Sequence, residues 1–510
     1  MFESILAGIT QALSPSMLLL IVIGTVSGVA VGAMPGLSAT MGLALLVPFS
    51  FAMDPTAGLV LLGGFYVGAI YGGAFTAILV NAPGTPSSIA TALEGYPMTK
   101  QGRSEEAIVG ATIGSFVGGV LGVVAMVVVG PLLAGFALNF GPQEYFWVAV
   151  FGLTIIVTLA EDSLLKGILG VVFGLVLGTI GLAPVGGDVR FTFGMSELQG
   201  GVELIPAMIG FFTIPEVIRL IANRHRDVEV YEQRAEKQSQ VKATVIAVFS
   251  RPLNLVRSSA IGAVVGALPG AGSSVSNLVA YNEARRASRT PERFGKGEVD
   301  GVVASETANN ATIGGGLVPT LSLGVPGSPP HAIILGALLL HGLRPGPGLF
   351  ESSGDLVYTF VTALAICAVV MVPVGLIAGR GLQRAVVVMP TRYLAPGIVV
   401  LSMVGAYAIR NSIIDVLLMG LLGVVGYLLR TIGIGPATVV LGLILGPIAE
   451  EGLVQGLQSS VGMDMPWTSF FSRPISIVLI LACVLSVGWS LRRARRGPKR
   501  DEVTSGEDGT

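Results

Sequence analysis

The sequence predicts an all-α polytopic membrane protein, built from two repeats of inverted topology whose helices are broken by Pro-Gly pairs. Charged residues make up only 12% of the 510-residue chain, about half of the roughly 25% usual for a soluble domain. Residues 4–53 and 55–93 contain no charged side chain. A helix needs about 20 apolar residues to cross the hydrocarbon core, so we expect about 12 spanning or re-entrant segments. Backbone amides facing lipid need partners within the segment, which favours helices.

The expectation of two repeats comes from breaks that recur in the apolar runs. Glycines four residues apart lead into a Pro-Gly pair in each copy: Gly24, Gly28, Gly32 and Pro35-Gly36, then Gly262, Gly266 and Pro269-Gly270. A second break follows in each copy: Gly72-Gly73 before residues 81–86, then Gly315-Gly316 before residues 324–329. Pro269 lies 234 residues after Pro35, and Pro326 lies 243 after Pro83. Paired Gly/Pro-interrupted segments point to the binding site of a secondary transporter.

Polar stretches divide the chain. We expect a first transmembrane half at residues 1–222, a cytoplasmic linker at 223–250, a second transmembrane half at 251–492 and a disordered cytoplasmic tail at 493–510. Basic residues concentrate in 219–257, 285–296 and 492–500, and short basic loops stay on the cytoplasmic side. Nucleic acid is not an expected partner, because the basic clusters flank apolar segments without any groove-reading module.

Residues 258–282 are apolar and lie between two basic clusters. If both clusters are cytoplasmic, this segment enters the membrane and returns on the same side, turning at Pro269-Gly270. The alternative is a single crossing with a kink. The inverted arrangement of the two halves is an expectation from transporter architecture.

The breaks are the candidate binding site. Proline removes a donor and interrupts a helix, and the helix that restarts exposes up to four unpaired N–H groups at the positive end of its dipole. Such an end suits a carboxylate. The candidates are Pro35, Gly36, Ser38 and Thr40; Asn81, Pro83, Gly84, Thr85 and Ser87; Pro269, Gly270, Ser273, Ser274 and Asn277; and Pro326, Gly327, Ser328 and His331. Any single serine can instead cap a helix or bond a neighbouring helix, and His331 can simply line the bundle.

Glu306, Asn309 and Asn310 form a further candidate group beside a charge-free run. A carboxylate at the head of a helix is stabilised by the dipole. Set deeper, it becomes a candidate proton or cation site, because a charge at mid-bilayer costs about 2.5–3.5 kcal/mol. The sequence contains no zinc-peptidase, P-loop or nucleophile-elbow motif. We therefore expect no enzyme activity, no metal and no cofactor, and any uphill transport must draw on an ion gradient or a partner.

Several of these motifs resemble the large permease subunit of tripartite tricarboxylate transporters (TctA-type). They are Gly28–Met41, Tyr71–Pro86, Glu94–Pro97, Gly266–Gly272, Glu306–Asn310 and His341–Pro347. The resemblance covers essentially the whole chain, with the motifs in the family's order. It departs at Pro329-Pro330-His331, where the family has small residues, and at Glu94, where it has aspartate.

The resemblance implies a permease of the bacterial inner membrane. Its implied partners are a small four-span membrane subunit and a periplasmic solute-binding protein that delivers an organic anion, often a citrate-like tricarboxylate. A sodium or proton gradient would drive uptake. The alternative function is a passive anion channel or facilitator, in which the broken helices line a pore.

Overall fold

The computed structural model describes residues 2–34, 36–81, 85–158, 163–222, 240–385, 391–461 and 466–495. Within these ranges the chain is helical apart from one short ribbon. Three of the candidate residues, Pro35, Pro83 and Gly84, lie outside the described residues. So do most of the expected linker, 223–239, and the tail beyond residue 495.

The first half contains nine α-helices in the described residues. They are α1 (Phe2–Ala12), α2 (Pro15–Gly32), α3 (Ala39–Phe51), α4 (Pro55–Val80), α5 (Ile89–Lys100), α6 (Ser104–Ala137), α7 (Pro142–Thr158), α8 (Leu164–Gly178) and α9 (Leu204–Ala222). Short 3₁₀ turns η1 (Pro86–Ser88) and η2 (Ser196–Leu198) and the antiparallel strands β1 (Gly181–Leu182) and β2 (Val189–Arg190) complete it.

The second half begins with α10, which covers part of the expected linker. Its helices are α10 (Val241–Phe249), α11 (Pro252–Ala267), α12 (Gly272–Ala287), α13 (Val299–Leu323), α14 (Pro329–Leu340), α15 (Pro347–Ser352), α16 (Gly354–Ala385), α17 (Thr391–Arg410), α18 (Ile413–Thr431), α19 (Pro436–Ser459), α20 (Ser469–Ser472) and α21 (Pro474–Arg495). Turns η3 (Pro291–Arg293) and η4 (Pro466–Thr468) are short 3₁₀ helices.

The expectation of a multi-pass membrane protein is confirmed. Seven helices in the described residues are long and apolar enough to cross a membrane: α2, α4, α6, α9, α16, α18 and α19. An eighth span results if Pro466–Ser472 and Pro474–Gly488, bent by 73°, count as one. Shorter apolar helices such as α3 and α14 accompany them, so some apolar segments are too short to cross alone.

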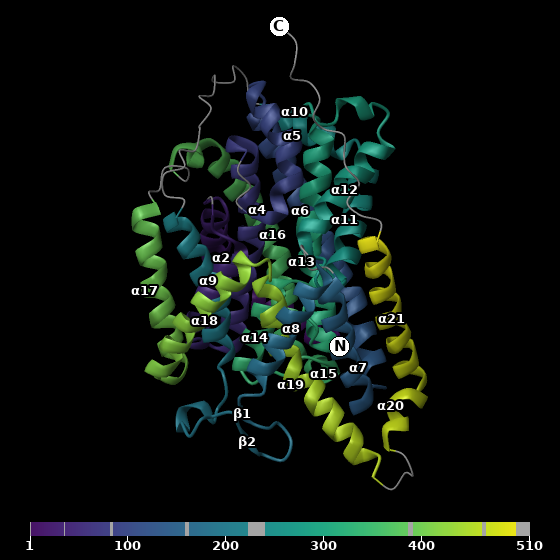
Figure 1. The fold of residues 1–510 in the computed structure, drawn as a ribbon. Helices are drawn as coiled ribbons and strands as arrows, with labels where there is room; N and C mark the ends of the chain where they lie inside the picture. Colours follow the sequence, from purple (N-terminus) through teal and green to yellow (C-terminus); the bar gives the residue numbers. More distant parts are fainter. Residues whose placement is uncertain are drawn as a thin grey trace.

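Helices α4 and α13 form the interior of the bundle. The apolar window of α4 is wholly buried, and α13 is buried almost continuously from Gly301 to Ser322. The outer helices α17 and α21 flank the molecule (Figure 1) and leave large apolar side chains exposed, as lipid contact requires. Figure 1 also separates two ends, one carrying α10 (the α10 end) and one carrying β1 and β2 (the ribbon end).

Close glycine contacts join α2 to α4. A Cβ at Gly28 would collide with the Phe65 carbonyl, and one at Gly32 with the Ala69 carbonyl. Residue numbers rise together along both helices, so α2 and α4 run in the same direction. Small residues at such interfaces let helix backbones approach closely.

The same arrangement recurs between α11 and α13. A Cβ at Gly262 would collide with the Ala308 carbonyl, and one at Gly266 would lie 2.7 Å from the Thr312 carbonyl oxygen. Each α11 glycine lies 234 residues after its α2 counterpart. Each α13 carbonyl lies 243 residues after its α4 counterpart. The two helix pairs therefore pack in the same register, with offsets equal to those between the breaks.

Helix α12 returns along α13 in the opposite direction to α11. Gly266 of α11 and Ser276 of α12 both lie at Thr312, with Ser276 Oγ 2.7 Å from Thr312 Oγ1. Further along α12, the Tyr281 ring packs beside Gly301, nearer the start of α13. The chain thus folds back at residues 268–271, which favours the hairpin interpretation over a single kinked crossing.

Candidate functional site

The four breaks are numbered along the chain: the first at Pro35-Gly36, the second at Gly72-Gly73 and residues 81–86, the third at Pro269-Gly270 and the fourth at Gly315-Gly316 and residues 324–329. The second break follows α4 and begins with a left-handed residue. Asn81 has φ 54° and closes the helix by donating its N–H to the Thr76 carbonyl, a conformation that asparagine adopts more readily than most residues. Thr85 lies against Gly73, and its Oγ1 is 2.8 Å from Ser87 Oγ and 3.1 Å from Ser88 Oγ. The three hydroxyls are buried together.

The fourth break repeats this geometry at the end of α13. Gly324 is left-handed at φ 71°, and Ser328 Oγ lies 2.6 Å from His331 Nδ1, against Gly316. Each of these residues lies 243 positions after its counterpart in the second break: Asn81 with Gly324, Gly73 with Gly316, Thr85 with Ser328, and Ser88 with His331.

His331 is held by three groups. Its Nε2 lies 3.1 Å from the Ile313 carbonyl and 3.4 Å from the Tyr66 hydroxyl, while Nδ1 faces Ser328 Oγ. A carbonyl can only accept, so Nε2 carries the proton and Nδ1 accepts from Ser328. These bonds favour the interpretation of His331 as a residue lining the bundle.

The third break touches the fourth. Gly270 adopts φ +80° and donates its N–H to the Gly327 carbonyl at 2.9 Å. Gly327 in turn lies so close to Gly316 that a Cβ would stand 3.0 Å from its Cα. Backbone approaches of this kind require glycine.

The third and second breaks also meet, through α12. Asn277 Nδ2 donates to the Ser87 carbonyl, while Asn277 Oδ1 is buried without a hydrogen-bond partner among the described residues. Ser273 contributes its carbonyl to Ser276 Oγ at 3.1 Å. Breaks from both halves of the chain therefore lie together inside the bundle.

The first break follows α2 and packs on α9. Gly36 has φ +88°, and Ser38 caps α3 by accepting the Met41 N–H at 3.1 Å. Its neighbour Leu37 packs on Leu220 of α9. The helices on either side of this break pack against elements of the other breaks: a Cβ at Gly72 of α4 would lie 3.0 Å from the Ala33 nitrogen at the end of α2, and α3 packs on α4 and α14. The side chains of Thr40 and Ser274 form no hydrogen bond to any described residue.

Glu306 lies at the centre of a buried polar cluster. Its Oε1 is 2.5 Å from Thr91 Oγ1 on α5, and its Oε2 accepts from Ser115 Oγ on α6 at 3.2 Å and from Asn309 Nδ2 at 3.4 Å. Asn310 Nδ2 donates to Ser115 Oγ at 2.8 Å. The helix-head interpretation is wrong, because Glu306 lies about two turns after the start of α13. Sequence reasoning missed Thr91 and Ser115, whose only signal is a hydroxyl within an apolar run.

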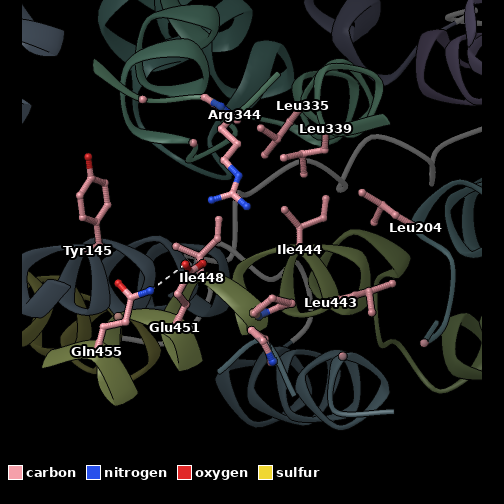
Figure 2. Close-up of a pocket in the computed structure, with 18 of the residues that line it drawn as sticks. Tyr145, Leu204, Leu335, Leu339, Arg344, Leu443, Ile444, Ile448, Glu451 and Gln455 are labelled. Carbon is pink, nitrogen blue, oxygen red and sulfur yellow. Dashed lines mark hydrogen bonds between the residues drawn. The ribbon is translucent and has the colours of Figure 1, made fainter. Parts of the chain in front are cut away.

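A cavity of about 920 Å³ lies near the ribbon end, between α7, α8, α9, α14 and α19 (Figure 2). It extends to Leu323 and Gly324, at the start of the fourth break. Figure 2 shows Arg344 projecting into it between Leu339 and Ile448. Arg344 forms no ion pair with the residues that the structure describes.

Comparison with known proteins decides the family. Residues 18–441 match the model of the tripartite tricarboxylate transporter TctA family. The chain belongs to the TctA family. It is therefore a membrane transporter component of tripartite tricarboxylate transport, and not an enzyme.

Two relatives of this TctA chain come from Agrobacterium vitis. One is a 52.8 kDa protein in the TAR-I ttuC' 3' region, 36% identical over 502 residues, which cover 98% of both chains. The other, in the TAR-II ttuC' 3' region, is 34% identical over 247 residues, 48% of this chain and all of the relative. No solved structure matches the chain.

Proposed function

We propose that this chain is the permease subunit of a binding-protein-dependent, ion-gradient-driven transporter that takes up organic carboxylates across the bacterial inner membrane. A periplasmic binding protein delivers the anion, and a small four-span subunit completes the permease. Family membership supports the assembly with such partners, and the solute class follows from the chemistry of the breaks.

The main support for the proposal is that interrupted helices from both halves of the chain contact one another. The contact of Gly270 with Gly327 and that of Asn277 with Ser87 bring the second, third and fourth breaks together. The start of α12 supplies first-turn amides there, which attract a carboxylate without a buried cation. The start of α14 supplies fewer, because Pro329 and Pro330 have no N–H.

We further propose that the halves are inverted repeats. Support comes from the matched glycine register of the two helix pairs and from their opposite directions. Thr99 Oγ1 donates to the Ile78 carbonyl at 2.7 Å, which places the end of α4 beside the end of α5. Gln101, just after α5, donates its Nε2 to the Lys296 carbonyl at 2.7 Å. Lys296 lies just before α13, so α13 begins at the end of the molecule where α4 and α5 end. Helices α4 and α13 therefore run oppositely, as in transporters built from inverted repeats.

The large cavity supplies an entry route in this proposal. It lies at the ribbon end, away from the basic loops that we assign to the cytoplasm. Its inner limit is the fourth break, and Arg344 provides a positive charge for an arriving anion.

The test is uptake in cells that lack their own carboxylate carriers. Expression of this chain together with its small subunit and binding protein should give concentrative uptake of a radiolabelled carboxylate, and omission of either partner should abolish it. Uncouplers and ionophores should remove accumulation. Rapid passive flux through the chain alone would instead establish a channel and refute the proposal.

A further inference from the structure

Glu306 differs from every other buried acid that the structure describes. Five carboxylates in the described ranges are buried: Glu94, Glu144, Glu298, Glu306 and Asp415. Glu144 pairs with Arg473 at 2.9 Å, Asp415 with Arg410 at 2.6 Å, and Glu298 with Arg293 at 3.2 Å. Glu94 accepts backbone N–H groups. Glu306 has neither a cation nor a backbone N–H among the described residues.

The groups that surround Glu306 can serve either protonation state. Two of its three partners, Thr91 and Ser115, are hydroxyls, which donate to a carboxylate but can also accept from a carboxylic acid. The backbone amides around Glu94 can only donate, so they cannot accept a hydrogen bond from a carboxylic acid. Backbone amides and the Tyr281 hydroxyl bond Glu94, whereas two hydroxyls and one side-chain amide bond Glu306.

Spare acceptors lie in the same cluster. The Oδ1 atoms of Asn309 and Asn310 are fully buried and have no hydrogen-bond partner in the described structure. A buried amide oxygen without a partner is costly. An added proton donor, or rotation of an amide toward a protonated Glu306, would satisfy these oxygens. The cluster therefore has enough free acceptors to bind one more proton than it holds when Glu306 is ionised.

We propose that Glu306 carries the coupling proton of the permease. Its carboxylate takes up one proton from the side with the higher proton concentration to become the neutral acid, and releases that proton on the opposite side as the solute is delivered. When Glu306 is ionised, its charge lies in a low-dielectric interior with no cation beside it, which is energetically unfavourable. This inference rests on the proposed function, because it names the driving ion of that transporter.

The position of Glu306 connects protonation to the breaks. Thr91, which lies 2.5 Å from Glu306, is three residues after the 3₁₀ turn of the second break. Asn309 lies one turn along α13 toward the fourth break. Loss of the negative charge on Glu306 weakens its bonds to Thr91 on α5 and Ser115 on α6, which link the first half to α13 of the second.

Other titratable groups around α13 are engaged elsewhere. The elements packed against α13 carry Tyr71 on α4, Glu94 on α5, Tyr281 on α12 and His331 on α14, and toward their ends Glu105 and Glu106 on α6 and Arg257 on α11. Tyr71 bonds Thr112 at 2.6 Å, Tyr281 bonds Glu94 at 2.7 Å, and His331 bonds Ser328. None of these groups bonds Glu306 in the described structure.

The experiment uses proteoliposomes that contain this chain and its small subunit, with the binding protein outside and pyranine inside. The probes are radiolabelled mono-, di- and tricarboxylates, including succinate and citrate. With sodium equal on both sides and the membrane potential clamped at zero, one imposed pH unit should change wild-type accumulation about tenfold for one coupled proton. Solute entry should acidify the lumen.

Glu306→Gln keeps size and neutral hydrogen bonding but cannot carry the proton. It should abolish gradient-driven accumulation and lumen acidification while retaining exchange of labelled for unlabelled solute at equal pH. Glu94→Gln is the matched control, a second buried acid whose variant should keep the pH-gradient dependence. Ser115→Ala should shift the pH profile of uptake.

Three results would overturn the proposal: wild-type accumulation that follows a sodium gradient and ignores pH, solute entry without acidification, or wild-type coupling in Glu306→Gln. The measurements on wild type need no variant, so misfolding of a variant leaves the test intact. Absence of any wild-type carboxylate uptake would instead refute the proposed function.

Discussion

The surrounding backbone leaves no space for a side chain at Gly327. Its carbonyl accepts the Gly270 N–H, and a Cβ on it would lie 3.0 Å from the Gly316 Cα and nearer still to the Gly266 carbonyl. All of these neighbours are backbone atoms, which cannot move aside as the end of a flexible side chain can. The contact between the third and fourth breaks therefore depends on glycine.

We expect Gly327→Val to abolish uptake while membrane insertion persists. Overpacking of this kind costs about 1–3 kcal/mol, enough to separate the two breaks without unfolding the bundle. The measurement is uptake per inserted protein. Gly135→Val is the control, because nothing lies within 4 Å of a Cβ at Gly135 on α6. Normal uptake in Gly327→Val would remove the site assignment.

Sequence alone predicted some residues of the polar cluster around Glu306 and missed others. Glu306 and Asn309 stood out because charged and amide side chains are rare in apolar runs. Thr91 and Ser115 did not, because a lone hydroxyl in a membrane helix usually bonds its own backbone. Their role depends on which helices become neighbours, and that is set by tertiary packing. The assignment of the break residues to a binding site stays a prediction.

Among the elements, α5 is fastened to the loop between α12 and α13. Glu94 on α5 accepts the N–H groups of Gly297 at 2.8 Å, Glu298 at 2.9 Å and Gly295, and the Tyr281 hydroxyl at 2.7 Å. The Glu94 carboxylate thus joins α5, the helix after the second break, to the α11–α12 hairpin that contains the third break.

Glu94→Ala should loosen this junction. Hydrogen bonds to charged groups contribute about 1.5–3 kcal/mol each, and the backbone amides would lose their acceptor. Hydrogen exchange at Gly295, Gly297 and Glu298 should accelerate. Glu283→Ala, on the exposed side of α12 beside Arg286, should leave exchange at these amides unchanged. Equal protection in Glu94→Ala and wild type would contradict the expectation.

The whole molecule presents different surfaces at its two ends. The ribbon end carries the cavity with Arg344, and beside it the exposed Phe193, while the α10 end carries the basic loop between α12 and α13. Composition alone predicted the helical, multi-pass character, because long charge-free runs leave few other structures. Helix ends and short apolar helices were harder to predict, since breaks inside apolar runs do not show where the chain folds back.

Arg344→Gln should raise the KM for the carboxylate about two- to fivefold, since an exposed ion pair contributes up to about 1 kcal/mol. High salt should reduce the difference, because exposed charges are screened. Initial uptake rates at low and high ionic strength measure both effects. Arg289→Gln at the α10 end is the control. An unchanged KM at low salt would exclude Arg344 from the entry route.

Orientation can be tested with single cysteines. Phe193→Cys at the ribbon end should react with a membrane-impermeant thiol reagent added to intact spheroplasts. Ser288→Cys, between α12 and α13 at the other end, should react only after permeabilisation. The native Cys367 and Cys483 are buried and give a low background. The reverse labelling pattern would invert the proposed topology.

The two adjacent prolines that open α14 make the halves of the molecule unequal. Ser87 keeps a backbone N–H at the position that Pro330 occupies 243 residues later. A perfectly symmetric carrier would rest equally often facing inward and outward. An anion that gains a bond worth about 1.5–3 kcal/mol in one half alone shifts that balance by roughly ten- to a hundredfold. We therefore expect the loaded carrier to favour one orientation, which would make its forward and backward turnover rates differ.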